Sequence, residues 1–426
     1  MDHFTYKNDE LYCENIPVSK ITAEVGTPAY IYSAATFRRH VQNYREAFAE
    51  MNPLICYSVK GCSNINILKM VADLDTGFDV VSGGELFRVA KAGGDTTKVV
   101  YAGVGKTDKE INEAIDANIA YFNVESEAEL ANLTKIANER KTIVKGALRV
   151  NPDVDPKTHR YTTTGKKESK FGVDIERAVA AFQEFGKDEY FKLCAIHLHL
   201  GSPINTTDPY VLAIDKALVM IEELRAQGFE IEAIDIGGGF GADYTTGQAP
   251  LTADYADVII PMLRDKGLKL ILEPGRSISG NAGIMVGQVV YVKKGGDKNF
   301  AILDAGMNDL IRPSLYEAFH FAWPVKVKPQ HSLDKRMDPM NLSDLVKTDI
   351  VGPICETGDY LALDRNLPAI ARGDQLAIFT AGAYGFAMSS QYNSHPRAAE
   401  VLVDGDSFKV IRQRESYDDL IAAEMS

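Results

Sequence analysis

The chain has 426 residues, of which 45% are hydrophobic and 25% are charged, and its net charge of −13 reflects 46 basic and 59 acidic residues. At this length one hydrophobic core is unusual, so two domains are expected. The acidic residues are scattered, and this balance argues against a nucleic-acid or anionic-membrane surface, which would need a basic patch. Local basic pockets for small anions are still compatible with it.

The N-terminus and the cysteines bear on the cellular compartment. Residues 1–5 show no basic stretch that leads into an apolar one, and no apolar run approaches the length of a membrane span, so neither a secretory signal nor a membrane segment is predicted. The five cysteines include no CxxC pair. This pattern favours a reducing cytoplasm, with neither a disulfide framework nor a metal site.

Short β-rich runs recur along the first two-thirds of the chain, separated by segments with a helical period. Such strands are expected at residues 54–59, 78–81, 98–101, 120–124, 146–150, 193–200, 231–236 and 268–272. Alternating strands and helices predict parallel βαβ units. Eight units over roughly 250 residues match a (β/α)8 TIM barrel in number and size, and the count favours it over the alternative, a doubly wound open sheet.

After residue 283 the pattern changes to strands joined by turns. Strands are expected there at residues 285–293, 299–304, 349–352, 375–380 and 397–403, and a further strand at 27–32 precedes the barrel. We therefore predict an α/β protein. Its barrel covers residues 36–283, and a second, mostly β domain is built from residues 1–35 and 284–426. The polar stretch 151–170 is the expected mobile loop.

Residues capable of chemistry follow several of the predicted barrel strands. Lys60 follows the first. His199 lies in the last residues of the sixth and Ser202 follows it, Gly237, Gly238 and Gly239 follow the seventh, and Glu273, Gly275 and Arg276 follow the eighth. In a barrel all strand ends open onto one face, where these side chains would converge. Each has an ordinary alternative: a solvated lysine, a packed histidine, a tight glycine turn or a surface ion pair. These alternatives weaken when all the residues share one rim.

The combination meets the needs of pyridoxal 5′-phosphate. The aldehyde of this cofactor requires a lysine for a Schiff base, and its phosphate requires N–H donors, as glycine-rich turns supply, and preferably a hydroxyl such as that of Ser202. Its ring nitrogen requires an acidic partner, for which Glu273 is the candidate. A carboxylate in that place favours decarboxylation over racemisation.

At these residues the chain resembles the fold-type III PLP-dependent decarboxylases, and the resemblance covers nearly the whole chain. It rests on Tyr57-Ser58-Val59-Lys60, residues 151–173, His197 to Ser202, Gly237 to Gly241, Glu273-Pro274-Gly275-Arg276, Arg312-Pro313-Ser314-Leu315-Tyr316-Glu317-Ala318, Cys355-Glu356-Thr357-Gly358-Asp359 and Gly382-Ala383-Tyr384-Gly385. Glu-Pro-Gly-Arg alone is moderately specific, whereas all the motifs in this order are strongly specific.

The resemblance implies roles for residues of both domains. Lys60 would form the Schiff base, His199 would stack on the cofactor ring, and Cys355 would be the proton donor once CO2 has left. The implied cofactor contacts are Lys60, His199, Ser202, Gly237, Gly238, Gly239, Glu273, Gly275, Arg276 and Tyr384. The implied substrate contacts are Arg276, Arg312, Tyr316, Glu356 and Tyr384. The segment with Cys355 and Glu356 would reach into a neighbouring subunit, which implies a homodimer with shared active sites.

The expected reaction is decarboxylation of meso-2,6-diaminopimelate at its D-centre to L-lysine and CO2, the last step of lysine biosynthesis. The alternatives are a related decarboxylase of carboxynorspermidine or a basic amino acid, and a PLP-binding protein without catalysis. Arg312 and Tyr316 have a structural alternative as loop anchors, and Cys355 as a small buried residue. The chain departs from the family pattern at Gly61-Cys62, where Ala-Asn is usual, and at Thr357, where serine is common.

Overall fold

The computed structural model describes residues 2–155, 170–245, 249–334, 336 and 342–425. Most of the loop predicted to be mobile, residues 156–169, lies outside these. The chain forms two compact units. The barrel unit comprises His40–Gly241 and Ala249–Ser277, and the β unit comprises Met1–Arg39, Ala242–Gln248 and Ile278–Ser426. The division predicted from the sequence, at residues 35/36 and 283/284, stays a prediction.

Eight parallel strands form a closed barrel in the barrel unit. They are β5 (Leu54–Ser58), β6 (Gly77–Val80), β7 (Val99–Tyr101), β8 (Tyr121–Val124), β9 (Val144–Asn151), β11 (Phe191–His197), β12 (Ala233–Asp235) and β13 (Lys269–Leu272). The pairs β13–β5 and β8–β9 close the circle, and β10 (Val173–Asp174) adds a short parallel pair to β9. The predicted barrel is therefore confirmed, and the open-sheet alternative is wrong.

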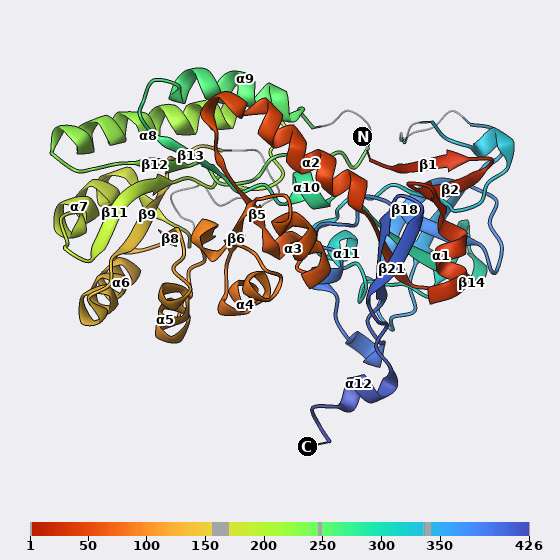
Figure 1. The fold of residues 1–426 in the computed structure, drawn as a ribbon. Helices are drawn as coiled ribbons and strands as arrows, with labels where there is room; N and C mark the ends of the chain where they lie inside the picture. Colours follow the sequence, from red (N-terminus) through yellow and green to blue (C-terminus); the bar gives the residue numbers. More distant parts are fainter. Residues whose placement is uncertain (1, 156–169, 246–248, 335, 337–341, 426) are drawn as a thin grey trace. The chain divides into compact units, whose positions relative to one another are not determined.

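Helices lie outside the barrel strands, as Figure 1 shows for α4 to α9. They are α2 (Ala34–Ala47), α3 (Ile65–Ala72), α4 (Gly83–Lys91), α5 (Asp108–Asp116), α6 (Glu127–Arg140), α7 (Ile175–Phe185), α8 (Asp208–Ala226), α9 (Thr252–Leu263) and α10 (Arg276–Ser279), with 3-10 turns η1 (Ala49–Met51), η2 (Val59–Gly61) and η3 (Thr96–Lys98). Polar N-caps start several of them close to the strand ends. Ser82, for example, accepts the Glu85 N–H at 3.2 Å and so begins α4 two residues after β6.

Apolar side chains from the barrel strands form one buried cluster. This cluster consists of Cys56, Val100, Tyr121, Ala147, Cys194, Ala195, Ala233 and Ile271, with Leu54 and Ala120 packed against it. Barrel strands bury both faces, so their sequences read as continuous apolar runs. That is why all eight were predictable, each to within a few residues of its observed bounds.

The β unit is built around a mixed sheet in the order β18-β17-β15-β14-β4-β20-β21, with β19 paired to β14 and β16 paired to β19. Its strands are β4 (Ala29–Ser33), β14 (Gly283–Gly295), β15 (Lys298–Leu303), β16 (Ala322–Pro324), β17 (Leu345–Val351), β18 (Tyr360–Pro368), β19 (Gln375–Ile378), β20 (Ala399–Asp404) and β21 (Ser407–Arg412). The strand near the N-terminus, β4, lies between β14 and β20. The prediction that both chain ends build this domain is confirmed.

Several smaller elements complete the β unit. They are β1 (Phe4–Lys7), β2 (Glu10–Cys13), β3 (Ile16–Pro17), α1 (Val18–Val25), α11 (Arg312–Tyr316), α12 (Tyr417–Ile421), η4 (Pro329–His331), η5 (Phe386–Met388) and η6 (Tyr392–Ser394). Across the described residues of both units, no helix is long and apolar enough to cross a membrane.

Candidate active site

Lys60 lies just beyond the end of β5, in the 3-10 turn η2 and not directly in a loop as predicted. Its ammonium pairs with the carboxylate of Asp79 on β6, and the Lys60 side chain is 31% exposed whereas that of Asp79 is fully buried. Ser58 Oγ lies 2.8 Å from Asp79 Oδ2 and 2.9 Å from the Glu273 carbonyl oxygen. Lys60 is therefore held at the rim by a buried acid that the sequence analysis did not single out.

The environment of Asp79 makes its carboxylate a stronger base than an ordinary aspartate. Burial raises the pKa of this carboxyl group, and the nearby charge of Glu273 adds to that effect. Lys60 and Ser58 oppose the shift, and the net pKa stays above the usual value. Asp79 is thus placed to exchange a proton with the amine of Lys60.

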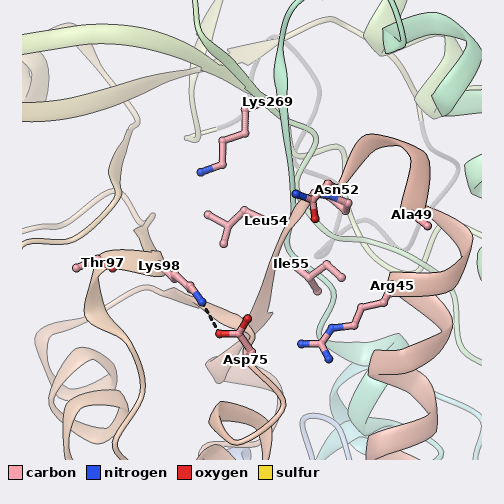
Figure 2. Close-up of a pocket in the computed structure, with 10 residues that line it drawn as sticks. Arg45, Ala49, Asn52, Leu54, Ile55, Asp75, Thr97, Lys98 and Lys269 are labelled. Carbon is pink, nitrogen blue, oxygen red and sulfur yellow. Dashed lines mark hydrogen bonds and ion pairs between the residues drawn. The ribbon is translucent and has the colours of Figure 1, made fainter.

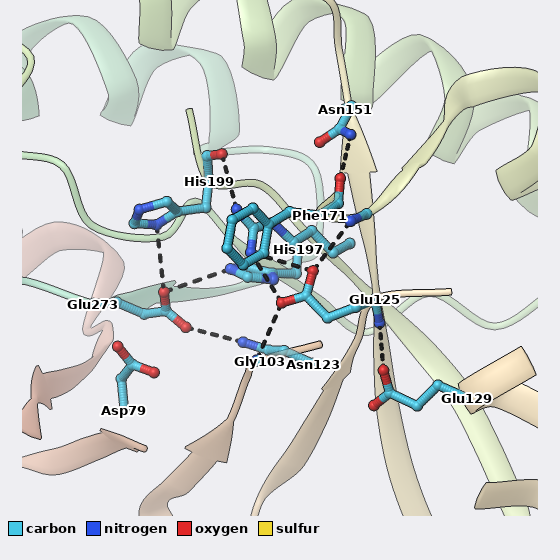
Figure 3. Close-up of polar contacts among 12 residues, drawn as sticks. Asp79, Gly103, Asn123, Glu125, Glu129, Asn151, Phe171, His197, His199 and Glu273 are labelled. Atoms are coloured by element: carbon cyan, nitrogen blue, oxygen red, sulfur yellow. Dashed lines mark hydrogen bonds and ion pairs between the residues drawn. The ribbon is translucent and has the colours of Figure 1, made fainter. Parts of the chain in front are cut away.

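Glu273, at the end of β13, is almost completely buried and is held by side chains from two other strands. Asn123 Nδ2 donates to Glu273 Oε1 at 2.9 Å, and His197 Nε2 lies 3.5 Å from Oε2, an ion-pair separation longer than an ordinary hydrogen bond. Figure 3 shows Asn123 and His197 converging on this carboxylate. Asn123 Nδ2 also donates to Asp235 Oδ2 at 3.2 Å, so one amide links the two buried acids.

The two acids differ in charge. Burial raises the pKa of Asp235 well above its usual value, and the neighbouring Glu273 raises it further. Burial acts in the same direction on Glu273, but His197 and Lys60 outweigh it and hold the pKa of Glu273 below its usual range. The surroundings therefore favour the negative charge on Glu273 and the proton of this pair on Asp235.

His199 is a neutral imidazole. Burial, followed by the charge of Arg149, lowers its pKa well below the usual value, and the Gly238 N–H donates to its Nδ1 at 3.2 Å. With Nδ1 as an acceptor, we assign the ring proton to Nε2. The 3.8 Å approach of Nδ1 to Glu273 is consequently a contact and not an ion pair. A neutral ring that is 20% exposed suits stacking on a flat cofactor.

The glycine turn after β12 has the tight geometry that its sequence predicted. Gly237 and Gly239 have positive φ angles of 70° and 92°. A Cβ on Gly238 would collide with the Glu273 carbonyl, and one on Gly239 would collide with the carbonyl of Gly201. Glycine is therefore required in this turn, because the backbone of neighbouring loops packs directly against it.

The loops after β11 and β13 meet at Ser202 and Arg276. The Arg276 Nε–H donates to Ser202 Oγ at 3.0 Å, and the Arg276 side chain is buried. Gly275 lies against Ser58, where a Cβ would come within 2.8 Å of the serine Cβ. The departure at Gly61-Cys62 lies on the same rim: Cys62 is buried, and its carbonyl accepts the Tyr57 hydroxyl at 3.1 Å.

The barrel unit thus brings together an amine, an ionised buried carboxylate, a neutral imidazole and a glycine turn. These are the groups that pyridoxal 5′-phosphate needs for its aldehyde, its ring nitrogen, its ring face and its phosphate. His197, His199 and Glu273 also have ligand atoms within 4.8 Å of one another, a spacing that a metal ion would accept. The donor set as a whole fits the organic cofactor, because a metal would leave Lys60 and the glycine turn without a role.

In the β unit, Cys355 and Glu356 lie in an exposed loop between β17 and β18. Asp359 anchors this loop by accepting the N–H groups of Met307 and Ile354, each at 2.6 Å. The Cys355 N–H donates to Asn393 Oδ1 at 2.9 Å. The alternative that Cys355 is a small buried residue is wrong, because its side chain is exposed.

Arg312 is buried at the start of α11. Its Nη1 donates to the Tyr244 hydroxyl at 2.7 Å and lies 3.2 Å from His320 Nε2. These are contacts that a loop anchor makes, so a role of Arg312 in substrate binding stays a prediction. Tyr316 ends the same helix half-exposed, and Tyr384 is half-exposed with a left-handed φ of 56°.

Comparison with known proteins places this site in a family. Residues 34–280 match the family model described as "Pyridoxal-dependent decarboxylase, pyridoxal binding domain". The diaminopimelate decarboxylase of Aquifex aeolicus is 47% identical over 98% of this chain and 96% of its own length. That of Haemophilus influenzae is 44% identical over 100% of this chain and 99% of its own.

Solved structures of diaminopimelate decarboxylases also match the fold of this chain. Diaminopimelate decarboxylase from M. jannaschii in co-complex with L-lysine is 35% identical to this chain, with a TM-score of 0.92. The match covers 100% of this chain and 98% of the M. jannaschii chain. The Helicobacter pylori enzyme complexed with L-lysine is 38% identical with a TM-score of 0.89, over 96% of this chain and 99% of that one. The chain therefore belongs to the pyridoxal-dependent decarboxylases and, within them, to the diaminopimelate decarboxylase family. It is a lyase whose cofactor is pyridoxal phosphate.

Proposed function

We propose that this enzyme removes the carboxyl group at the D-centre of meso-2,6-diaminopimelate and releases L-lysine and CO2, as the last step of lysine biosynthesis. The observation that carries the proposal is the rim where Lys60, Glu273 and His199 meet. Full-length relatives named diaminopimelate decarboxylase, two of them solved with L-lysine, support the choice of substrate. When bound, pyridoxal phosphate supplies the electron sink for the pair released as the carbon–carboxylate bond breaks.

Within the barrel unit, the charge of each residue suits it to a different role. Lys60 must lose a proton before its amine can attack a carbonyl, and Asp79 is positioned to take that proton at Oδ2. Glu273 stays ionised and can hold a proton on the ring nitrogen, because Asn123 and His197 fix the carboxylate in place. Neutral His199 would stack on the cofactor ring without adding positive charge. Ser202, the glycines at 237–239, Gly275 and Arg276 would hold the cofactor.

The β unit supplies the substrate's remaining contacts and the final proton in this proposal. Arg312 and Tyr316 would bind the distal carboxylate together with Arg276, which belongs to the barrel unit, because arginine presents a planar pair of donors. Glu356 would bind the distal ammonium, and Tyr384 would contact both substrate and cofactor. The loop of Cys355 and Glu356 is exposed and would enter a second subunit's barrel in a homodimer. Cys355 would there donate the proton that replaces the departing carboxyl group.

The proposed compartment is the cytoplasm, and the proposed partners are the amino-acid substrate and a second copy of the chain. A reducing compartment suits five cysteines that are all unpaired. The runner-up activity is decarboxylation of carboxynorspermidine or a basic amino acid. It is disfavoured because the chain carries the full Arg-Pro-x-Leu-Tyr-x-Ala motif from Arg312 to Ala318.

Product analysis tests the proposed reaction. The holoenzyme is incubated separately with meso-diaminopimelate, carboxynorspermidine, ornithine and lysine, and amines and CO2 are quantified. We expect L-lysine and CO2 in equal amounts from the first substrate and at least about a hundredfold lower kcat/KM with the others, because they lack the second amino-acid head group. Turnover of only the polyamine precursor would refute the proposal.

The role of Cys355 has its own test. Cys355→Ala should lower kcat by roughly a hundredfold or more, since a proton donor in the transition state is lost. The absorbance of the bound cofactor should persist, because that residue lies outside the barrel unit. Cys13→Ala, at a buried cysteine of the same unit, is the matched control and should retain kcat. Full activity of Cys355→Ala would remove this cysteine from the mechanism.

A further inference from the structure

A cavity of about 580 Å³ lies at the opposite end of the barrel from Lys60. Residues at the starts of β5 and β13 and just before β6 and β7 line it, whereas Lys60 follows the end of β5. Because all the barrel strands are parallel, these are the two different ends of the barrel. The volume falls within the range of small-molecule sites. Nothing in the proposed decarboxylation uses this cavity.

The cavity is positively charged although the chain as a whole is acidic. Three cations line it, Arg45, Lys98 and Lys269, together with one carboxylate, that of Asp75, which gives 3 − 1 = +2. The whole chain has a net charge of −13. Figure 2 shows Lys269 and Arg45 extending from different elements, with Leu54 and Ile55 between them in this view.

Two of these cations have no ion pair within the described part of the chain: Arg45 and Lys269. The acids around them pair with other cations. Lys98, and to a smaller extent the charge of Arg45, lowers the pKa of Asp75, whose carboxylate pairs with Lys98. Glu50, close to Arg45 in sequence, accepts from Arg264 Nη2 at 3.0 Å. Glu232, whose carbonyl accepts the Lys269 N–H at 2.9 Å, binds Lys145 Nζ at 2.7 Å through its carboxylate.

The third cation is fixed in place. Lys98 pairs with Asp75, and a second carboxylate, that of Asp95, lies 3.8 Å from its Nζ. The wall between the free cations is apolar, because Leu54 and Ile55 face the cavity there. A ligand would thus meet two unsatisfied positive charges across an apolar surface.

We infer that this cavity is a binding site for a small anion that carries two or more negative charges, such as a phosphate ester or a di- or tricarboxylate. Arg45 and Lys269 are its anchoring residues. Each of their charge-assisted hydrogen bonds would contribute enough that loss of one weakens binding by about tenfold. The site is separate from the cofactor and does not depend on the proposed reaction.

Calorimetric titration of the holoenzyme tests the inference, with inorganic phosphate, citrate and succinate as probes. Saturation with pyridoxal phosphate keeps the cofactor's own phosphate site filled. We expect one site per chain with Kd of roughly 1 mM or tighter at physiological salt, and weaker binding as NaCl is raised. A preference for phosphate would assign the site to phosphate esters, and a preference for citrate or succinate would assign it to carboxylates.

Three variants locate the binding. Arg45→Gln and Lys269→Gln should each raise Kd by about tenfold while the melting temperature stays within a few degrees of the parent. Lys192→Gln is the matched control: this exposed lysine lies near the start of β11, outside the cavity, and its Nζ donates to the Asp188 carbonyl at 3.0 Å. Its Kd should not change.

Three outcomes would overturn the inference. The first is no saturable binding by any probe below roughly 10 mM. The second is binding that both cavity variants retain. The third is an equal loss in Lys192→Gln, which would mean a response to overall charge and not to this cavity. Arg45 and Lys269 lie in different elements. If one variant fails to fold, the Kd of the other variant still tests the inference.

Discussion

At the end of the barrel where the strands finish, three acids are buried and hydrogen-bonded within the unit. At the end where the strands begin, Lys269 is exposed and Arg45 and Lys98 are half-buried, and Arg45 and Lys269 lack an ion pair among the described residues. Asp79, Asp235 and Glu273 share the first end, and each has a hydrogen-bond partner within the unit. This difference shows how the two ends of one barrel can serve catalysis and ligand binding separately. Buried charge that is fixed by neighbours sets protonation states for catalysis, while exposed charge without a partner is available to a ligand.

Removal of the amine at the catalytic end should have the largest effect. Lys60→Ala eliminates the nucleophile towards the cofactor aldehyde, so we expect kcat to fall by at least about a thousandfold. The absorbance of covalently bound cofactor should disappear from the resting enzyme. The comparison control is Lys192→Gln, which should keep both. A resting spectrum unchanged in Lys60→Ala would contradict the assignment of this lysine.

The two buried acids should respond differently to replacement by their amides. Glu273→Gln removes a negative charge, and we expect a loss of roughly a hundredfold or more in kcat with a changed absorbance of the bound cofactor. Asp235→Asn should cost less than about tenfold and leave the spectrum unchanged, because burial and Glu273 raise the pKa of Asp235 towards its neutral form and the amide keeps the shape. Equal losses in the two variants would show that Asp235 is ionised as well.

Glu85 tests whether burial at this end also shapes pH dependence. Burial raises its pKa to about 7 from the usual 4.5, although Lys60 and the Val81 N–H oppose the shift. The folded state therefore holds more protons than the unfolded one between these values, and stability should fall as pH rises from about 4.5 to about 7. Above that window this contribution is constant.

Glu85→Gln should remove that slope. Its free energy of unfolding at pH 8 should exceed the parent's by on the order of 1 kcal/mol, a figure kept small because the side chain is only partly buried. Denaturant titrations at pH 5 and pH 8 measure the change. Parallel pH profiles in variant and parent would show that this carboxyl titrates normally.

Much of the barrel and its catalytic rim could be predicted from the sequence. Strands buried on both faces are apolar throughout, and Lys60, His199 and Glu273 follow such strands directly. What escaped were polar residues inside apolar strands, Asp79 and Asn123 among them. A single buried acid in the run Gly77–Val80 was the available signal, but nothing in the sequence showed which partner it would meet.

Elements at the edges of the β unit also escaped prediction. β21 alternates exposed and half-buried residues, so it lacks an apolar run, and β18 is mixed in the same way. The cavity at the far barrel end was invisible for another reason. Arg45, Lys98 and Lys269 are far apart in sequence and belong to no motif, and only the closed barrel brings them to one cavity.

The most direct test of the central claim is the absorbance spectrum of the holoenzyme before and after addition of meso-diaminopimelate, recorded together with lysine release. The account predicts a spectrum of covalently bound cofactor in the resting enzyme, a change on mixing, and L-lysine formed in step with CO2. A spectrum that does not change when meso-diaminopimelate is added, with no lysine formed, would contradict it.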